Sequence, residues 1–133
     1  MQQTNQILRP VFWTSWVMSG IVILFMLMDA VGKFVQPAEV VQGTIQLGFA
    51  EHHILIIGIL GFISTLFYVI PRTSVLGAIL LTGFWGGAVA TNFRLDLPLF
   101  SHILFPAYLG ILAWGGLWLR DLALRKLFPV KGI

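Results

Sequence analysis

The ionisable and amide side chains that could bind a ligand stand at the ends of the long apolar segments of this sequence. The candidate residues are Asp29, Lys33, Glu51, His52, His53, Asn92, Arg94, Asp96 and His102. They come from the end of the first apolar segment, the start of the second, the end of the third and the start of the fourth. Segments that run alternately up and down bring these four places to the same end of a helical bundle. Because ionisable groups at membrane depth usually face the bundle interior or a cavity, we predict a polar vestibule at that end.

Three of these residues carry specific expectations. Asp29 and Lys33 are four residues apart and share a helix face, so we expect an ion pair that lets an apolar segment hold both charges. That pair is compatible with a role in ligand binding. For Arg94 we weigh two alternatives: its planar guanidinium binds an anion or the vestibule acids, or its side chain reaches out to lipid headgroups.

The histidines favour hydrogen bonding at helix mouths over metal binding. His52 and His53 are adjacent, so on one helix their side chains point about 100° apart and cannot chelate one metal together. A two-histidine-plus-carboxylate site that includes His102 is the weaker alternative, and we assign no metal ligand.

Several kinds of chemistry are excluded by composition. The chain has no cysteine, which rules out a disulfide, a thiolate metal site and thiol–disulfide catalysis. It also lacks a phosphate-cradling loop and a Ser-His-Asp pattern, so no residue stands out as a nucleophile and enzymatic activity stays open. The basic balance comes from the C-terminal end and suits an anionic membrane surface rather than nucleic acid.

The elements that must position the vestibule are transmembrane helices. Of the 133 residues, 58% are hydrophobic and only 10% are charged, and the mean hydropathy is +0.93. This is too little polar surface for a soluble domain. We predict an all-α polytopic membrane protein: one domain over residues 1–133, built as a four-helix bundle with spans at about 11–34, 53–70, 73–91 and 103–119. Gly83, Gly86 and Gly87 are expected to let neighbouring helices approach the third span closely.

Two shorter segments and the distribution of positive charge complete the expected topology. Residues 38–50 are too short to cross, so we predict a short helix lying at the membrane interface after the first span. Residues 120–133 form a basic tail. Six lysines and arginines fall on the side of the termini and two on the other side, which predicts that both termini are cytoplasmic.

Three phrases of the sequence resemble the DoxX-like family of small four-helix integral membrane proteins. They are LMDAVGKFVQP in the first span, IPRTSVLGAILLTGFWGGAVATNFR in the third, and PLFSHILFPAYLGILAWGGLWLRD leading through the fourth. The resemblance implies a four-helix bundle in a bacterial inner (cytoplasmic) membrane and, for the founding members, a subunit of a thiosulfate:quinone oxidoreductase. The sequence departs from the family at Gly61, where relatives often carry a glutamate, and at Asn92, where relatives commonly have histidine.

The function expected first is therefore that of a quinone-linked oxidoreductase subunit that contacts the lipid bilayer. Its ligand would be a quinone or a small anion, and a membrane or soluble redox partner would complete the reaction. Phe84, Trp85 and Phe93 are interpreted as lipid contacts and core, with a quinone-stacking surface as the alternative. The competing functions are a non-catalytic assembly or partner-binding protein, and passage or sensing of a small solute.

Overall fold

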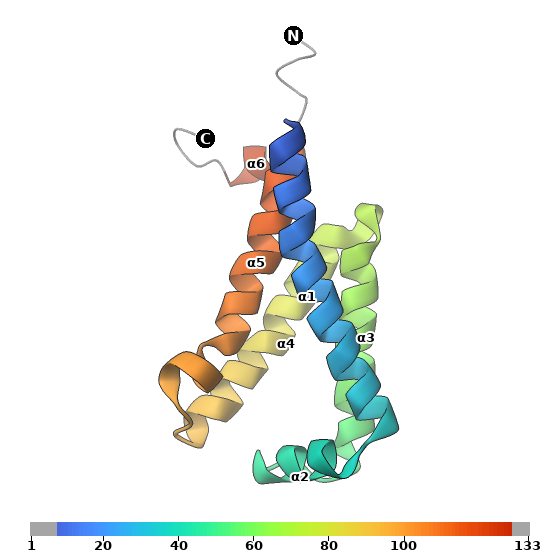
Figure 1. The fold of residues 1–133 in the computed structure, drawn as a ribbon, viewed down its shortest axis with the longest axis vertical. Helices are drawn as coiled ribbons and strands as arrows, with labels where there is room; N and C mark the ends of the chain where they lie inside the picture. Colours follow the sequence, from blue (N-terminus) through green and yellow to red (C-terminus); the bar gives the residue numbers. More distant parts are fainter. Residues whose placement is uncertain (1–7, 129–133) are drawn as a thin grey trace.

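All the regular elements of residues 8–128, the part of the chain that the computed structural model describes, are helices. In chain order they are α1 (Arg9–Val35), α2 (Ala38–Gln46), α3 (His53–Val69), the 3-10 turn η2 (Pro71–Thr73), α4 (Ser74–Arg94), the π-helical turn η3 (Leu99–Ile103), α5 (Phe105–Arg120) and α6 (Leu122–Leu127) (Figure 1). The predicted all-α fold is confirmed.

Prolines and one left-handed residue set the helix boundaries. Pro10 lies in the first turn of α1, where its missing N–H has no intrahelical partner. At the other end, Gln36 adopts φ 57° and donates its N–H to the Gly32 carbonyl, and Pro37 prevents α1 from continuing. Pro71 opens the tight η2 turn into α4. These local signals explain why the helices agree closely with the predicted segments.

Three helical segments are long and apolar enough to cross a membrane. They are Arg9–Val35, Pro71–Arg94 and Leu99–Arg120. The segment expected as the second span forms the shorter apolar helix His53–Val69 of 17 residues. Like the three longer helices, it exposes large apolar side chains, such as Ile56 and Ile63, which do not line the cavity described below. Such faces suit contact with the lipid bilayer.

The four long helices form a bundle in which α1 packs on α5 and α3, and α4 packs on α3 and α5 (Figure 1). Glycines allow the close approaches of α1. An added Cβ at Gly116 of α5 would lie 2.6 Å from Ser19 Oγ, and one at Gly58 of α3 would lie 2.9 Å from Lys33 Cβ. The first half of α1 therefore packs on α5 and its last turns pack on α3.

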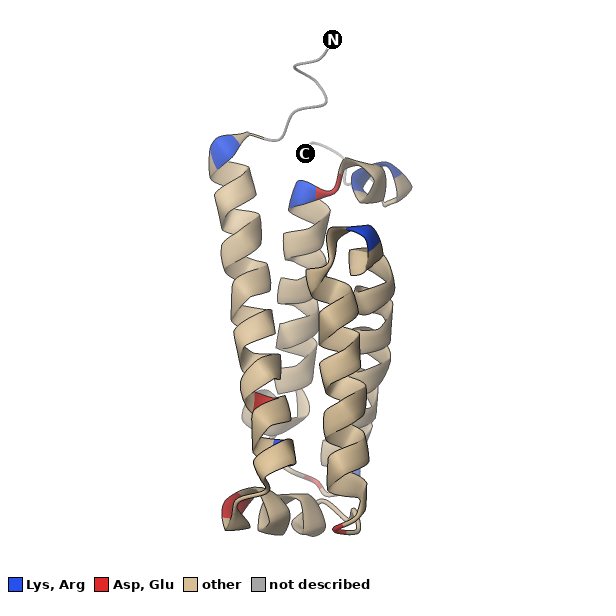
Figure 2. Ribbon diagram, turned by 90° about the vertical axis from the view of Figure 1, so that its right-hand side faces the viewer, with Lys and Arg blue, Asp and Glu red and all other residues tan. Residues whose placement is uncertain are grey.

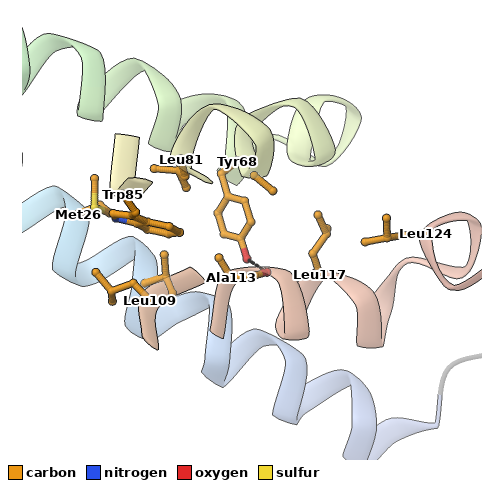
Figure 3. Close-up of a cluster of buried hydrophobic side chains, with 10 residues drawn as sticks. Met26, Tyr68, Leu81, Trp85, Leu109, Ala113, Leu117 and Leu124 are labelled. Carbon is orange, nitrogen blue, oxygen red and sulfur yellow. Dashed lines mark hydrogen bonds between the residues drawn. The ribbon is translucent and has the colours of Figure 1, made fainter. Parts of the chain in front are cut away.

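A series of hydrogen bonds joins α1, α3 and α5 beside the apolar core. Figure 3 shows the bond of this series that links Tyr68 to Ala113. Arg120 can only donate, and its Nη1 bonds Ser19 Oγ at 2.6 Å. Ser19 Oγ lies 2.7 Å from the Tyr68 hydroxyl, which donates to the Ala113 carbonyl at 2.7 Å. Ser19 and Tyr68 are fully buried, so the series satisfies polar groups that would otherwise destabilise the bundle interior.

The predicted basic tail contains a helix that was not predicted, α6, which includes Arg125 and Lys126. Asp121 caps this helix by accepting a hydrogen bond from the Leu124 N–H at 3.1 Å, and Leu124 is buried against the core. An aspartate before Leu-Ala-Leu was a visible signal for a helix start. Residues 129–133, which include Lys131 of the tail, lie outside the described residues.

Charged residues separate between the two ends of the bundle (Figure 2). The end that holds α6 and η2 carries Arg9, Arg72, Arg120, Arg125 and Lys126, with Asp121. The other end, where α2 lies across the bundle, carries Asp29, Glu39, Glu51 and Asp96, with Lys33 and Arg94. The predicted convergence of four helix ends at one place is thus present in the fold.

Candidate functional site

A cavity of about 610 Å³ lies inside the bundle near the α2 end. All five elements α1 to α5 contribute to its wall, which is mostly apolar and aromatic. The aromatic lining residues are Phe25, Phe49, Phe84, Trp85 and Phe105. The rings of Phe25 and Phe105 meet edge to face with centroids 5.1 Å apart, so they join α1 to α5 at the wall. A volume of this size and lining is typical of sites for small organic ligands.

Gly83 and Gly87 of α4 lie in the cavity wall, and they do not bring helices together. A Cβ added at Gly83, Gly86 or Gly87 would meet no atom within 4 Å, and Gly83 and Gly87 line the cavity wall. The expected close packing through these three residues is therefore wrong. Close packing of α4 depends on Gly77 instead, where an added Cβ would lie 2.1 Å from the backbone nitrogen of Tyr68.

The ion pair expected between Asp29 and Lys33 is confirmed, and it lies in the cavity wall. Lys33 Nζ is 2.5 Å from Asp29 Oδ2, and the two side chains are 16% and 31% exposed, respectively. It is the one salt bridge among residues 8–128. The pair gives the cavity a polar side with no net charge. The carboxylate still has free acceptor positions, and the ammonium group still has free N–H donors.

Arg94 bonds to a backbone carbonyl and to none of the acids among the described residues. Its Nη2 donates to the Leu47 carbonyl at 2.8 Å, just after α2. Leu47 and Phe49 both line the cavity. Gly48 between them has φ +96°, and a Cβ there would lie 2.6 Å from Arg94 Nη2. Arg94 thus links the C-terminal end of α4 to the segment after α2 that lines the cavity. None of the vestibule acids expected to hold it (Asp29, Glu51 and Asp96) is its partner.

Asn92 lines the cavity and connects it to η3. Its Nδ2 donates to the His102 carbonyl at 2.8 Å, and His102 Nδ1 lies 2.8 Å from Ser101 Oγ. The His102 side chain is exposed and is not part of the lining. Asn92 therefore uses one of its two side-chain N–H donors in this bond, and the other N–H and the side-chain oxygen are left for a ligand.

Besides Arg94 and His102, four more predicted vestibule residues lie away from the cavity lining: Glu51, His52, His53 and Asp96. The rings of His52 and His53 are 4.3 Å apart, closer than the expectation of divergent side chains suggests. His53 Nδ1 accepts the Ala50 N–H at 3.1 Å, which is the predicted role at a helix mouth. Within the described part of the chain, no group of three His, Cys, Asp or Glu residues could hold a metal.

Three cavity residues with polar atoms were not among the candidates. Thr44 and Thr91 donate to carbonyls one turn back, Val40 at 2.8 Å and Gly87 at 2.8 Å. The i, i+4 series Gly83, Gly87 and Thr91 was a signal in the sequence for one small, weakly polar helix face. The third residue is Trp85, interpreted above as lipid contact and core with a quinone-stacking surface as the alternative; its side chain is buried and lines the cavity.

A protein-family model, described as the DoxX-like family, matches residues 17–116. The match covers most of the chain and includes every residue that lines the cavity. It confirms the resemblance that the three sequence phrases indicated. No curated protein and no solved structure matches the chain.

Proposed function

The chain belongs to the DoxX-like family, and we propose that it is a subunit of a quinone-linked membrane oxidoreductase that binds the quinone in the cavity between α1 and α4. One observation carries this proposal: the cavity of about 610 Å³ has aromatic walls and a polar side formed by Asp29, Lys33 and Asn92. A quinone ring with an apolar tail requires this combination of aromatic walls and hydrogen-bonding groups.

The side chains divide the work of binding. Phe84 and Trp85 offer ring faces and edges, and Phe25 with Phe105 closes the wall between α1 and α5. Lys33 and Asn92 offer N–H donors, and the Asp29–Lys33 pair places proton-exchanging groups in the cavity wall. A bound quinone takes up two electrons and two protons to become a quinol. The electrons would come from a membrane or soluble redox partner, because this chain has no cysteine for thiol chemistry.

The proposed membrane setting is a single domain with four spans in a bacterial inner membrane, with both termini in the cytoplasm. The helix α3 has 17 residues, about 26 Å at 1.5 Å per residue, which is close to the hydrocarbon thickness of about 30 Å. It packs between α1 and α4, and both are long enough to cross. Helix α2 lies across the end of the bundle (Figure 1), as expected of an interfacial helix. The basic α6 end would face the cytoplasm.

The proposal is tested by filling the cavity from a glycine that has open space. Gly83→Phe places a ring in the cavity, whereas Gly86→Phe places the same ring on the same helix outside the cavity lining. Each variant is solubilised gently and its lipid extract is analysed for quinone by mass spectrometry. We expect quinone at about one per chain in the wild type and Gly86→Phe, and at least a fivefold lower content in Gly83→Phe.

Equal quinone content in all three proteins would show that any retained quinone lies elsewhere, and the proposal would fail. Wild-type protein without quinone but with a stoichiometric protein partner would favour the non-catalytic assembly function. The thermal unfolding midpoint of each variant serves as the folding control, because a ring in an open cavity should leave the packed half of the bundle intact.

A further inference from the structure

One buried polar atom in the structure has no hydrogen-bond partner. Among the described residues, 8–128, it is Nε1 of Trp85, and the side chain is only 4% exposed. Leaving a buried donor without an acceptor costs about 1–3 kcal/mol. A phenylalanine would fill an apolar core without that cost, so the nitrogen calls for an explanation.

Other tryptophans of the chain do satisfy their indole nitrogens. Trp114 Nε1 donates to Thr82 Oγ1 at 2.7 Å, and Trp118 Nε1 donates to the Phe128 carbonyl at 2.8 Å. Neither residue lines the cavity, whereas Trp85 does. Of these three tryptophans, the one whose indole nitrogen has no partner is therefore the one that lines the cavity.

The indole nitrogen is covered in the structure, and its neighbours are residues of the cavity wall. Figure 3 shows the Trp85 nitrogen toward Met26 and turned away from Tyr68. Met26 and Leu109, which flank the ring, line the cavity, and Tyr68 does not. Neither apolar neighbour offers an oxygen, and no described residue accepts this N–H, so we look for the acceptor in a molecule bound in the cavity.

We propose that Trp85 is the inner anchor of the ligand site, and that its indole N–H donates to a carbonyl oxygen on the buried end of a planar, neutral ligand; this inference rests on the proposed function of the cavity. An indole N–H can only donate, so the ligand atom must be an acceptor. The charged groups in the cavity wall, Asp29 and Lys33, neutralise each other, so a neutral carbonyl avoids the desolvation cost of an anion.

The second polar group of such a ligand would face the ion pair. Asp29 follows Met26 by three residues on α1, which is a rise of about 4.5 Å along the helix. The inner donor at Trp85 and the outer donor at Lys33 thus stand at successive levels of the same cavity. A ring that carries oxygens on opposite edges matches this arrangement, with the apolar remainder against the aromatic wall.

The test compares two probes of similar shape, 1,4-naphthoquinone and naphthalene, in nanodiscs that hold the full chain. The wild type should bind naphthoquinone more tightly than naphthalene, and Trp85→Phe should reduce that preference about tenfold by removing the buried hydrogen bond. Naphthalene has no carbonyl to accept the indole N–H, so its binding should change little. It serves as the control for the smaller volume of phenylalanine and for partitioning of the probe into lipid. Trp114→Phe is the matched control and should keep the wild-type preference.

A second measurement uses the wild-type chain and does not depend on the variant folding. In protein labelled with 15N-tryptophan, the Trp85 indole resonance is assigned by elimination with phenylalanine variants of the other four tryptophans. Naphthoquinone should shift its N–H proton downfield, and naphthalene should not.

The outcomes separate this inference from the proposed function. If Trp85→Phe keeps the wild-type preference, or the Trp85 indole proton responds alike to both probes, the inner anchor is overturned while the quinone site stands. If the wild type binds neither probe, or if Gly83→Phe leaves the binding of both probes unchanged, the cavity is not the binding site. Both the proposed function and the Trp85 anchor are then overturned.

Discussion

At the scale of single residues, the Asp29–Lys33 pair is the feature whose energetics can be tested most directly. The two charges lie 2.5 Å apart in a helix that is long and apolar enough to cross a membrane. Asp29→Asn or Lys33→Met alone leaves one charge unpaired, which should lower the free energy of unfolding by about 2–3 kcal/mol. The double variant should lose less than the sum of the two single losses. A double-mutant cycle of unfolding in mixed micelles measures the difference, and additive losses would argue against coupling.

The helix pair α3 and α4 depends on a close approach at one glycine. At Gly77 an added Cβ would lie 2.1 Å from the backbone nitrogen of Tyr68, so Gly77→Ala must push the two helices apart. We expect a loss of unfolding free energy of about 2–3 kcal/mol, at the upper end of overpacking effects. Gly86→Ala is the matched control on the same helix, where nothing lies within 4 Å, and it should lose nothing. Equal thermal midpoints for the two variants would show that α4 does not pack on α3 as described.

Arg94 attaches the segment after α2 to the bundle, and two independent substitutions can test this role. Arg94 Nη2 holds the Leu47 carbonyl, and Gly48→Ala would place a Cβ 2.6 Å from that same nitrogen in a backbone conformation that strains alanine. Both Arg94→Ala and Gly48→Ala should free the segment after α2 and reduce retention of the bound molecule severalfold. Arg94→Lys should fall between Arg94→Ala and the wild type, because an ammonium on a shorter, less pre-organised stem reaches the carbonyl less well.

Hydrogen exchange of residues 44–49 measures the freed segment, and mass spectrometry of extracts measures retention. Gly43→Ala is the control, since a Cβ there meets no atom within 4 Å and the backbone is helical. If Arg94→Lys equals the wild type in both measurements, a headgroup contact explains Arg94 better than this attachment does.

For the whole molecule, the features that could be predicted are those written in local sequence. Helix ends at Pro10, Gln36-Pro37 and Pro71 follow from backbone chemistry, and the Asp29–Lys33 pair follows from the helical repeat. The roles of the α4 glycines could not be predicted, because which face of α4 meets α3 is decided by packing between helices. Arg94 donates to a backbone carbonyl, and the indole nitrogen of Trp85 has no acceptor among the described residues. Neither fact can be predicted from the types of the side chains and their order in the sequence.

The four-span arrangement is the prediction that concerns the whole molecule, and its critical element is α3 with its 17 residues. The chain has no cysteine, so single-cysteine variants give a clean accessibility test. Gln42 and Pro71 flank α3, and Pro98 and Ala123 flank η3 and α5; all four are exposed. In the proposed topology, the surplus of Lys and Arg at the α6 end predicts that positions 71 and 123 are cytoplasmic. An impermeant maleimide should therefore label Gln42→Cys and Pro98→Cys in intact cells, and Pro71→Cys and Ala123→Cys only after permeabilisation. Labelling of positions 42 and 71 from the same side would show that α3 does not span, and labelling of position 98 from the cytoplasmic side only would reverse the orientation.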